Sequence, residues 1–245
     1  RAQEPVTWSG YAYFVAYTIF TMGNGDFTPT HGEWQLATGV ATGSGMLLVT
    51  LSVTYVLSVL DGVNEKRAFA EGVTGLGRES EALVRTGWNE RNEDFRDLHV
   101  PLTDLSSQLD MVTQQHLSYP ILHYYRSTKM QAAAPVAAVI LSEALFVLRA
   151  GVQEEYRPNE TLRSEVQSSL GSYLDVLEKS GVIGPSDEVP PAPDLDSLRD
   201  AGVPTVPDEE FAEALAAEEE RRRKLLALLD QSEWNWPMVT EAVSE

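Results

Sequence analysis

The residues with the most distinctive chemistry form the uncharged stretch Thr-Met-Gly-Asn-Gly at positions 21–25, which Asp26 follows. A dehydrated cation needs oxygens in place of its water shell, and backbone carbonyls directed at one axis supply them. Holding successive carbonyls on one side requires backbone angles that glycine adopts at little steric cost, which explains Gly23 and Gly25. The hydroxyl of Thr21 would add a further ring of oxygens. The stretch therefore predicts a cation site made of carbonyls, with an ordinary Asn-Gly surface turn as the alternative.

Two apolar segments flank this loop and decide between the two interpretations. Residues 11–20 are too short to span a bilayer but suit a re-entrant helix of about residues 10–20. Residues 34–60 contain no charged side chain over 27 positions, which is roughly 40 Å of helix against about 30 Å of hydrocarbon. Irregular backbone at membrane depth is tolerated only where it lines water or is buried in protein. The arrangement therefore predicts a pore built from several chains.

The order of elements is a short helix, a Thr-x-Gly-x-Gly-Asp loop and a long apolar helix. It resembles the pore module of two-transmembrane-type potassium channels, whose signature is Thr-Val-Gly-Tyr-Gly-Asp. The resemblance implies a homotetramer in the lipid bilayer that passes potassium or other monovalent cations passively down their gradient. It also implies that the ions are held in a selectivity filter at residues 21–26.

The filter departs from the family at two positions, because Met22 and Asn24 stand where the family has valine and tyrosine. In the family that tyrosine packs against aromatic residues of the pore helix and braces the filter. Tyr13 and Phe14 occupy the places of those aromatics, but the shorter Asn24 is expected to reach them less well. These departures leave potassium selectivity and a less selective monovalent-cation filter both open.

Two further residues are expected to support the filter. Tyr17 takes the place of an acidic residue that can pair with the filter aspartate in the family. A hydrogen bond between Tyr17 and Asp26 is therefore one hypothesis, and simple packing of Tyr17 is the interpretation that we favour. The family resemblance also places Phe14 in the supporting layer.

A glycine hinge is implied on the long apolar helix. In the family it lies 19 residues after the filter aspartate, and the same count from Asp26 reaches Gly45. The alternative for this helix is that glycines only allow close packing in lipid, which we favour for Gly43. With a hinge at Gly45, a hydrophobic ring that could gate by dewetting would face the pore at Met46, Val49, Val53 and Leu57.

Charge divides the chain into two unlike parts. Residues 1–60 hold one basic and three acidic residues, whereas residues 61–245 hold 17 basic and 34 acidic residues. Such an acidic part argues against a nucleic-acid partner, which requires a basic face. The chain has no cysteine, and its sequence shows no catalytic triad, phosphate loop or metal-spaced cluster. We therefore expect neither an enzyme nor a resident cofactor or metal site.

The family resemblance also fixes an expected orientation in the cell membrane. The filter loop enters from outside, so the long helix leaves the bilayer into the cytoplasm at Asp61 and the C-terminal part is cytoplasmic. No apolar span precedes the predicted pore helix, so we expect a fragment that lacks the outer helix of the family. The competing function is a membrane-anchored signalling or scaffold protein with a non-conducting pore, for which Asn24 is the support.

The fold class expected throughout is all-α. A pore module at residues 1–60 would be followed by a flexible or bent connector at 61–100, a helical domain at 101–183, a proline-rich, largely extended linker at 184–208, and a C-terminal helix and tail at 209–245.

Two features of the helical domain allow more than one interpretation. Residues 131–152 are apolar almost all round, but a carboxylate at Glu143 would be costly at the centre of a bilayer. We therefore favour a central helix of a bundle over a second span, with a histidine, tyrosine or arginine as partner of Glu143. His116 and His123 are interpreted as polar residues of a helical core, with a proton sensor or metal ligands as the alternative.

Overall fold

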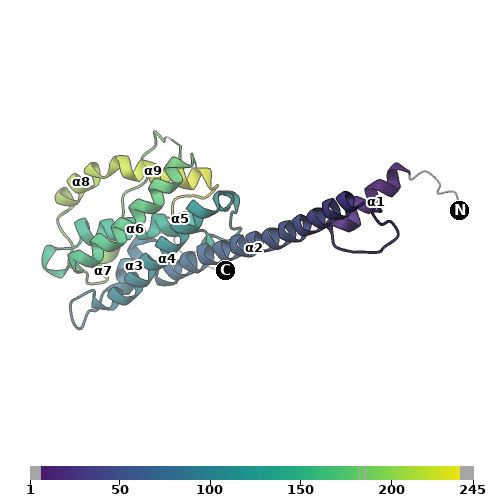
Figure 1. Cartoon of the computed structure of the whole chain (residues 1–245). Helices are drawn as coiled ribbons and strands as arrows, with labels where there is room; N and C mark the ends of the chain where they lie inside the picture. Colours follow the sequence, from purple (N-terminus) through teal and green to yellow (C-terminus); the bar gives the residue numbers. More distant parts are fainter. Residues whose placement is uncertain (1–6, 182, 185, 238–245) are drawn as a thin grey trace, which may run out of the picture. The chain divides into compact units, whose positions relative to one another are not determined.

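The computed structural model describes residues 7–181, 183–184 and 186–237, which are all-α without a β-strand (Figure 1). Packing divides the chain into two compact units, the first ending at Leu60 and the second beginning at Asp61. The first six residues of the predicted pore module and the last eight of the predicted tail lie outside the described residues.

The first unit contains a short helix and the start of a long one. Helix α1 (Trp8–Ile19) begins at Thr7, whose side chain accepts a hydrogen bond from the backbone N–H of Gly10. Its 12 residues measure roughly 18 Å, too short to cross the hydrocarbon layer. Helix α2 (Gly32–Leu76) has 45 residues and is long and apolar enough to span a membrane.

Helix α2 continues well beyond the end that the sequence predicted at residue 60. The flexible connector expected from residue 61 is helical up to Leu76 in spite of Gly72 and Gly75. Phe69, Ala70 and Val73 on this extension are fully buried in the core of the second unit. Because each of these side chains is removed from water, tertiary packing outweighs the low helix propensity of the glycines.

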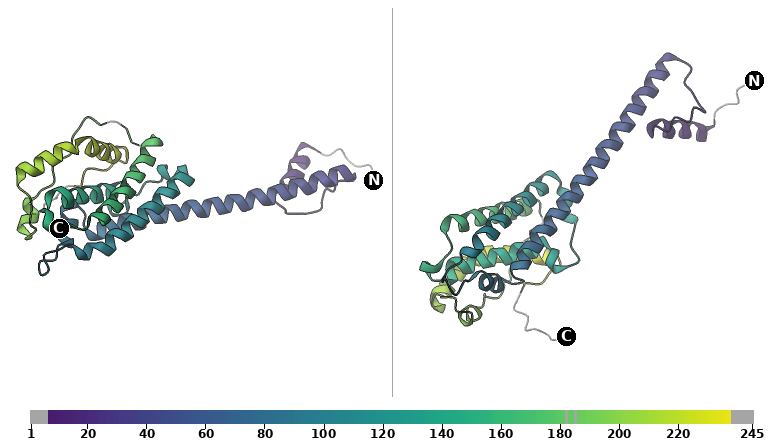
Figure 2. Two further views of the ribbon diagram at one scale, coloured as in Figure 1. Left: turned by 60° about the vertical axis from the view of Figure 1, so that its left-hand side comes forward. Right: turned by 90° about the horizontal axis from the view of Figure 1, so that it is seen from below.

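The second unit is a bundle of helices. Its helices after α2 are α3 (Ser80–Gly87), α4 (His99–Ser118), α5 (Ala134–Phe146), α6 (Glu160–Lys179), α7 (Asp196–Asp200), α8 (Asp208–Ala217) and α9 (Glu219–Gln231). Helices α4 and α6 pack along each other, and α5 contacts α3, α6 and α9. Figures 1 and 2 show α8 and α9 along one side of this bundle.

Helix α5 is the central element of the bundle. Every residue of it except Pro135 is buried, and a π-helical turn (Val147–Gly151) extends it. Residues 134–151 would be apolar enough to cross a membrane, but 83% of this segment is buried inside the structure. A helix that neighbours cover on all sides is apolar all round for that reason. The packing supports a central bundle helix and not a lipid-facing span.

A buried ion pair ties α5 to α9. The Arg222 guanidinium donates from Nε to Oε2 of Glu143 at 2.9 Å and places a second nitrogen 2.8 Å from the same oxygen. The predicted partner of Glu143 is therefore confirmed, and it is an arginine. Burial raises the pKa of the Glu143 carboxyl, and the hydrogen bond and charge of Arg222 oppose that rise. The same guanidinium donates to the backbone carbonyls of Pro190 and Pro191.

The proline-rich stretch is not the extended linker that its composition predicted. Apolar side chains interrupt the prolines and enter the core, and α7 forms among them. The buried side chains are Leu195, Leu198, Val203 and Val206.

The expected single C-terminal helix is two helices that meet at Glu218. The backbone of Glu218 leaves helical geometry (φ −96°, ψ 2°). Its carboxylate accepts hydrogen bonds from Arg149 and Arg221. These bonds stabilise the boundary between α8 and α9, which the sequence pattern did not predict.

Replacing Arg222 by methionine is expected to destabilise the second unit by about 3–5 kcal/mol, because Glu143 would remain buried without its partner. Replacing Glu143 by leucine in the same chain should recover much of that loss, since an apolar pair of similar volume suits the site. Urea unfolding of the purified chain, followed by tryptophan fluorescence, measures both effects. Equal stability of Arg222→Met and the wild type would contradict this account.

Candidate functional site

The predicted filter loop begins directly at the end of α1. The backbone N–H of Thr21 donates to the Thr18 carbonyl at 3.2 Å, and the N–H of Met22 donates to the Tyr17 carbonyl at 2.9 Å. These two bonds use carbonyls that the last turn of a helix otherwise leaves without a partner. The start of the loop is thereby fixed to the helix that precedes it.

The backbone of the loop alternates in sign along the chain. Thr21, Gly23 and Gly25 have φ of 57°, 61° and 77°, whereas Met22 and Asn24 are not in this left-handed region. Such alternation gathers successive backbone groups of one type on one side of the chain. The sequence predicted such backbone angles for the two glycines. It did not predict a positive φ for Thr21, and at a β-branched residue this conformation costs of order 1–3 kcal/mol.

Tyr13 is the hub of the hydrogen bonds that hold the loop. Its hydroxyl donates to Oδ2 of Asp26 at 2.9 Å and accepts from the Asn24 side-chain amide at 2.6 Å. Asn24 therefore reaches an aromatic residue of α1 by a hydrogen bond in place of ring packing. That it holds the loop less well than a tyrosine stays a prediction. One hydroxyl connects both ends of the Asn-Gly-Asp segment to the helix.

The hypothesis of a hydrogen bond between Tyr17 and Asp26 is wrong, whereas the packing of Tyr17 that the sequence favoured is present. The Tyr17 hydroxyl donates to the backbone carbonyl of Phe27 at 2.5 Å. Tyr13 and Tyr17 are four residues apart and share one face of α1, so both rings face the returning loop. Tyr13, one helical turn before Tyr17, is the residue whose hydroxyl bonds to Asp26.

Aromatic packing supports these hydrogen bonds. Tyr17 is buried, and its ring meets those of Tyr13 and Phe14 edge to face, with centroids 5.1 and 5.4 Å away. The Phe27 ring lies 6.4 Å from that of Tyr13. Phe14 thus packs on Tyr17, and the role of both residues in supporting a filter stays a prediction. The sequence analysis did not predict the polar contacts of Tyr13 and of the Phe27 carbonyl. The four-residue spacing of the two tyrosines was the available signal.

The apolar part of α2 is exposed around its circumference. Met46, a predicted pore-facing residue, is 66% exposed, and Leu51 between the predicted positions is 58% exposed. Exposure on the single chain therefore does not distinguish the predicted stripe from the other faces. An apolar surface of this length needs lipid or other protein around it.

The hydroxyls in this apolar run are satisfied inside the helix. Thr38, Thr50 and Thr54 donate to the carbonyls four residues earlier, at 2.8, 2.9 and 3.0 Å. Backbone groups and side chains that pair within one helix leave no polar group to water, which is the condition for crossing a bilayer.

Gly45 is a glycine of α2 that lies directly against the end of α1. A Cβ on Gly45 would lie 2.0 Å from the carbonyl oxygen of Ile19, whereas one on Gly39 or Gly43 would meet nothing within 4 Å. Within the chain, close helix packing thus falls on Gly45 and not on Gly43. Helix α2 runs through Gly45 as one helix, and the hinge remains a prediction.

The two histidines that the sequence left open lie in the second unit. The rings of His116 and His123 are 4.9 Å apart, and the His116 ring meets that of Tyr173 edge to face. In the part of the chain that the structure describes, no three histidine, aspartate or glutamate side chains are placed to hold a metal ion.

Comparison with known proteins agrees with the site at the N-terminal end. Residues 2–61 match the family model described as "Ion channel". The chain is 39% identical over 243 residues to the "Uncharacterized membrane protein YdjJ" of Bacillus subtilis (strain 168), covering 99% of the chain and 70% of that relative. No solved structure matches the chain.

Substituting Gly45 by alanine is expected to loosen the first unit, because the added Cβ cannot fit beside the Ile19 carbonyl. Gly43→Ala is the matched control, since its Cβ meets open space and alanine favours a helix by about 1 kcal/mol over glycine. Thermal denaturation of the purified protein in detergent, followed by size-exclusion chromatography, compares the two. A Gly45→Ala protein as heat-stable as the control would show that the close approach is not needed.

Proposed function

This chain belongs to the ion channel family, and on that premise we propose that it forms a homotetrameric pore for passive transport of monovalent cations, with potassium preferred over sodium. The observation that carries the proposal is the sign alternation of the loop backbone at Thr21, Gly23 and Gly25. Such strain persists only where surrounding structure holds it, and it concentrates at functional sites.

In the proposed assembly, the loops of four chains surround one axis. The residues from Thr21 to Asp26 are exposed on the single chain and are therefore accessible to face that axis. Rings of backbone carbonyls from Thr21, Met22, Gly23 and Asn24, with the Thr21 hydroxyl below them, would replace the water shell of the ion. Gly25 completes the turn of the backbone, and Asp26 anchors the loop to α1.

The preference for potassium depends on how firmly the loop is held. Hydrogen bonds from Asn24 and to Asp26 meet at the single hydroxyl of Tyr13. A hydrogen bond contributes about 1 kcal/mol, so the pair restrains the spacing of the carbonyl rings. The brace is polar where the family uses a packed tyrosine, and that is the residue-level argument for selectivity without tyrosine at position 24.

The other parts of the chain take roles that follow from the pore. Residues 34–60 of α2 would line the inner pore and contact lipid, with Gly45 as the hinge and a hydrophobic gate at Met46, Val49, Val53 and Leu57. Basic residues at Lys66, Arg67 and Arg78 follow the span, as is typical of a cytoplasmic exit. The helical second unit is then cytoplasmic and serves assembly or control of the gate.

The test is the reversal potential of the full-length protein in planar bilayers, with potassium on one side and sodium on the other. We expect a value near the potassium equilibrium potential for the wild type. A value near zero would make the pore non-selective. Intact tetramers that pass no current under any condition would favour the scaffold function over the channel.

Tyr13→Phe is expected to lower the potassium-to-sodium permeability ratio by about fivefold to thirtyfold, the range for losing one or both of two hydrogen bonds of about 1 kcal/mol each. Tyr11→Phe serves as the control, since Tyr11 is exposed on α1 and makes no hydrogen bond with the loop. Unchanged selectivity in Tyr13→Phe would show that the hydroxyl does not brace the filter.

Gly25→Ala is expected to abolish the current while tetramers still assemble. A Cβ at this position meets no atom within 4 Å, so the cost comes from the φ of 77° and not from a clash. Single-channel recording and cross-linking of the same preparation separate conduction from assembly. Normal conductance in this variant would refute the required left-handed backbone.

A further inference from the structure

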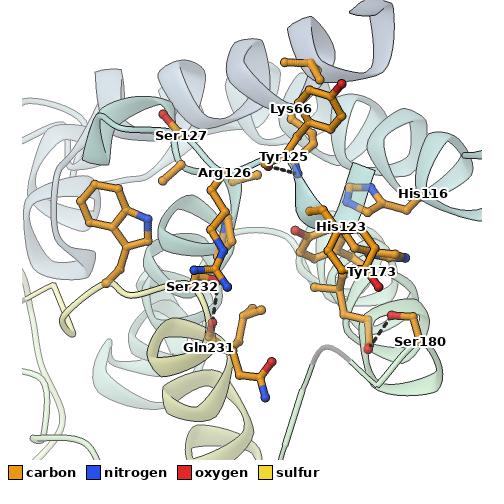
Figure 3. A pocket seen from close by; sticks show the side chains of 18 of the residues that line it. Lys66, His116, His123, Tyr125, Arg126, Ser127, Tyr173, Ser180, Gln231 and Ser232 are labelled. Atoms are coloured by element: carbon orange, nitrogen blue, oxygen red, sulfur yellow. Dashed lines mark hydrogen bonds between the residues drawn. The ribbon is translucent and has the colours of Figure 1, made fainter. Parts of the chain in front are cut away.

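The second unit contains a cavity of about 230 Å³ between its helices. Figure 3 shows Lys66 entering from α2, His116 from α4, Tyr173 from α6 and Gln231 from α9. Ser180 and Ser232 directly follow the last residues of α6 and α9. Ligand pockets for drug-sized molecules are typically about 300–1,000 Å³. A cavity of this size therefore suits a smaller ligand.

The charged side chains around the cavity are basic, whereas the net charge of the second unit is negative. Its basic lining residues are Lys66, Arg67, Arg126 and the two histidines His116 and His123, and no aspartate or glutamate is among the described residues that line it. The segment from residue 61 onward carries 34 acidic against 17 basic residues. Exclusion of every carboxylate from this lining indicates an anionic occupant.

Lys66 is the one lysine or arginine among the described lining residues that is not exposed, and it lacks a counter-charge. Its Nζ donates to the carbonyl oxygens of Leu122 at 2.8 Å and Tyr125 at 3.1 Å, and no carboxylate oxygen of the described residues lies within 4 Å of it. An ammonium group has three donors, so one donor remains for a ligand. Burial lowers the pKa of Lys66 to about 8, and a bound anion would offset that cost.

The other basic groups contribute less charge. Arg126 pairs with Glu233 at 2.7 Å, and Arg67 is exposed at the rim. The Nδ1 of His116 donates to the Val112 carbonyl at 2.7 Å. Burial lowers the pKa of His116 to about 4, with the charge of Lys66 adding to the effect, so His116 is neutral at pH 7. Arg67 has no carboxylate of the described residues within 4 Å either, but it is exposed, so water and salt screen its charge. The cavity therefore offers one uncompensated positive charge that is partly removed from water.

Neutral donors and apolar walls complete the site. The Nδ1 of His123 is buried without a hydrogen-bond partner among the described residues. Burial raises the pKa of the Tyr173 hydroxyl, which keeps its proton and remains a donor. The remaining wall is largely apolar and consists of Val63, Ala133, Ala134, Pro135, Leu177 and Leu228.

We propose that this cavity binds a small organic monocarboxylate, with its carboxylate on the Lys66 ammonium and its carbon body against the apolar wall. One uncompensated cation matches a monoanion better than a doubly charged phosphate. The ligand would connect α2 with α4, α6 and α9, so its binding stabilises the attachment of α2 to the bundle. The site is independent of whether the pore conducts.

The test uses the full chain in detergent at pH 7, with thermal unfolding measured in increasing sodium butyrate, sodium benzoate or sodium phosphate at constant ionic strength. We expect a saturable rise in melting temperature with at least one carboxylate. Lys66→Met should weaken the apparent affinity at least tenfold. Lys179→Met, an exposed lysine outside the lining, should leave the affinity within twofold of the wild type.

A second measurement on the wild type keeps the proposal testable if Lys66→Met does not fold. At pH 8, near the pKa of free Lys66, carboxylate binding should take up protons, so the calorimetric heat should depend on the buffer. Saturable binding of phosphate without carboxylate would overturn the ligand class. Absence of saturable binding by both carboxylates, unchanged affinity in Lys66→Met, or binding without proton uptake would overturn the site.

Discussion

The backbone between Thr21 and Gly25 has to hold three residues at positive φ, and the rest of the first unit is arranged to keep it there. Two backbone bonds fasten the start of the loop to the last turn of α1. The Tyr13 hydroxyl holds its far end through Asn24 and Asp26. Since Thr21 has no glycine-like freedom at φ 57°, these contacts must stabilise the loop by more than the strain costs.

Helix α2 has to satisfy two different environments along its length. Up to Leu60 its side chains are apolar and exposed, and its threonine hydroxyls bond within the helix, as a bilayer requires. From Asp61 onward it becomes amphipathic, and Phe69 and Val73 enter the core of the bundle. One continuous helix therefore belongs to both units, so a ligand that contacts Lys66 acts on the helix that also carries the pore-module residues.

In the second unit, charged side chains lie mostly at the surface, and those that are buried have specific surroundings. Its surface is strongly acidic, but the buried Glu143 is neutralised by Arg222, and the cavity around Lys66 excludes carboxylates. Both cases follow from the high free energy of an unpaired charge away from water. Arg222 has a protein partner inside the bundle, whereas Lys66 has only carbonyl oxygens, and this difference separates a structural ion pair from a candidate binding site.

The local pattern of residues was enough to determine the short helix, the glycine-containing loop, the long apolar helix and the all-α class, because these depend on spacing and hydropathy along the chain. The pattern also required a buried partner for Glu143. Tertiary structure decided that the partner is Arg222, 79 residues away, and that Tyr13 rather than Tyr17 meets Asp26. It also turned the expected connector and linker into packed helix and core, because burial of Phe69 and Leu198 overrides the glycines and prolines beside them. Contacts between residues distant in sequence leave no periodic signal, so only the folded chain shows which side chains meet.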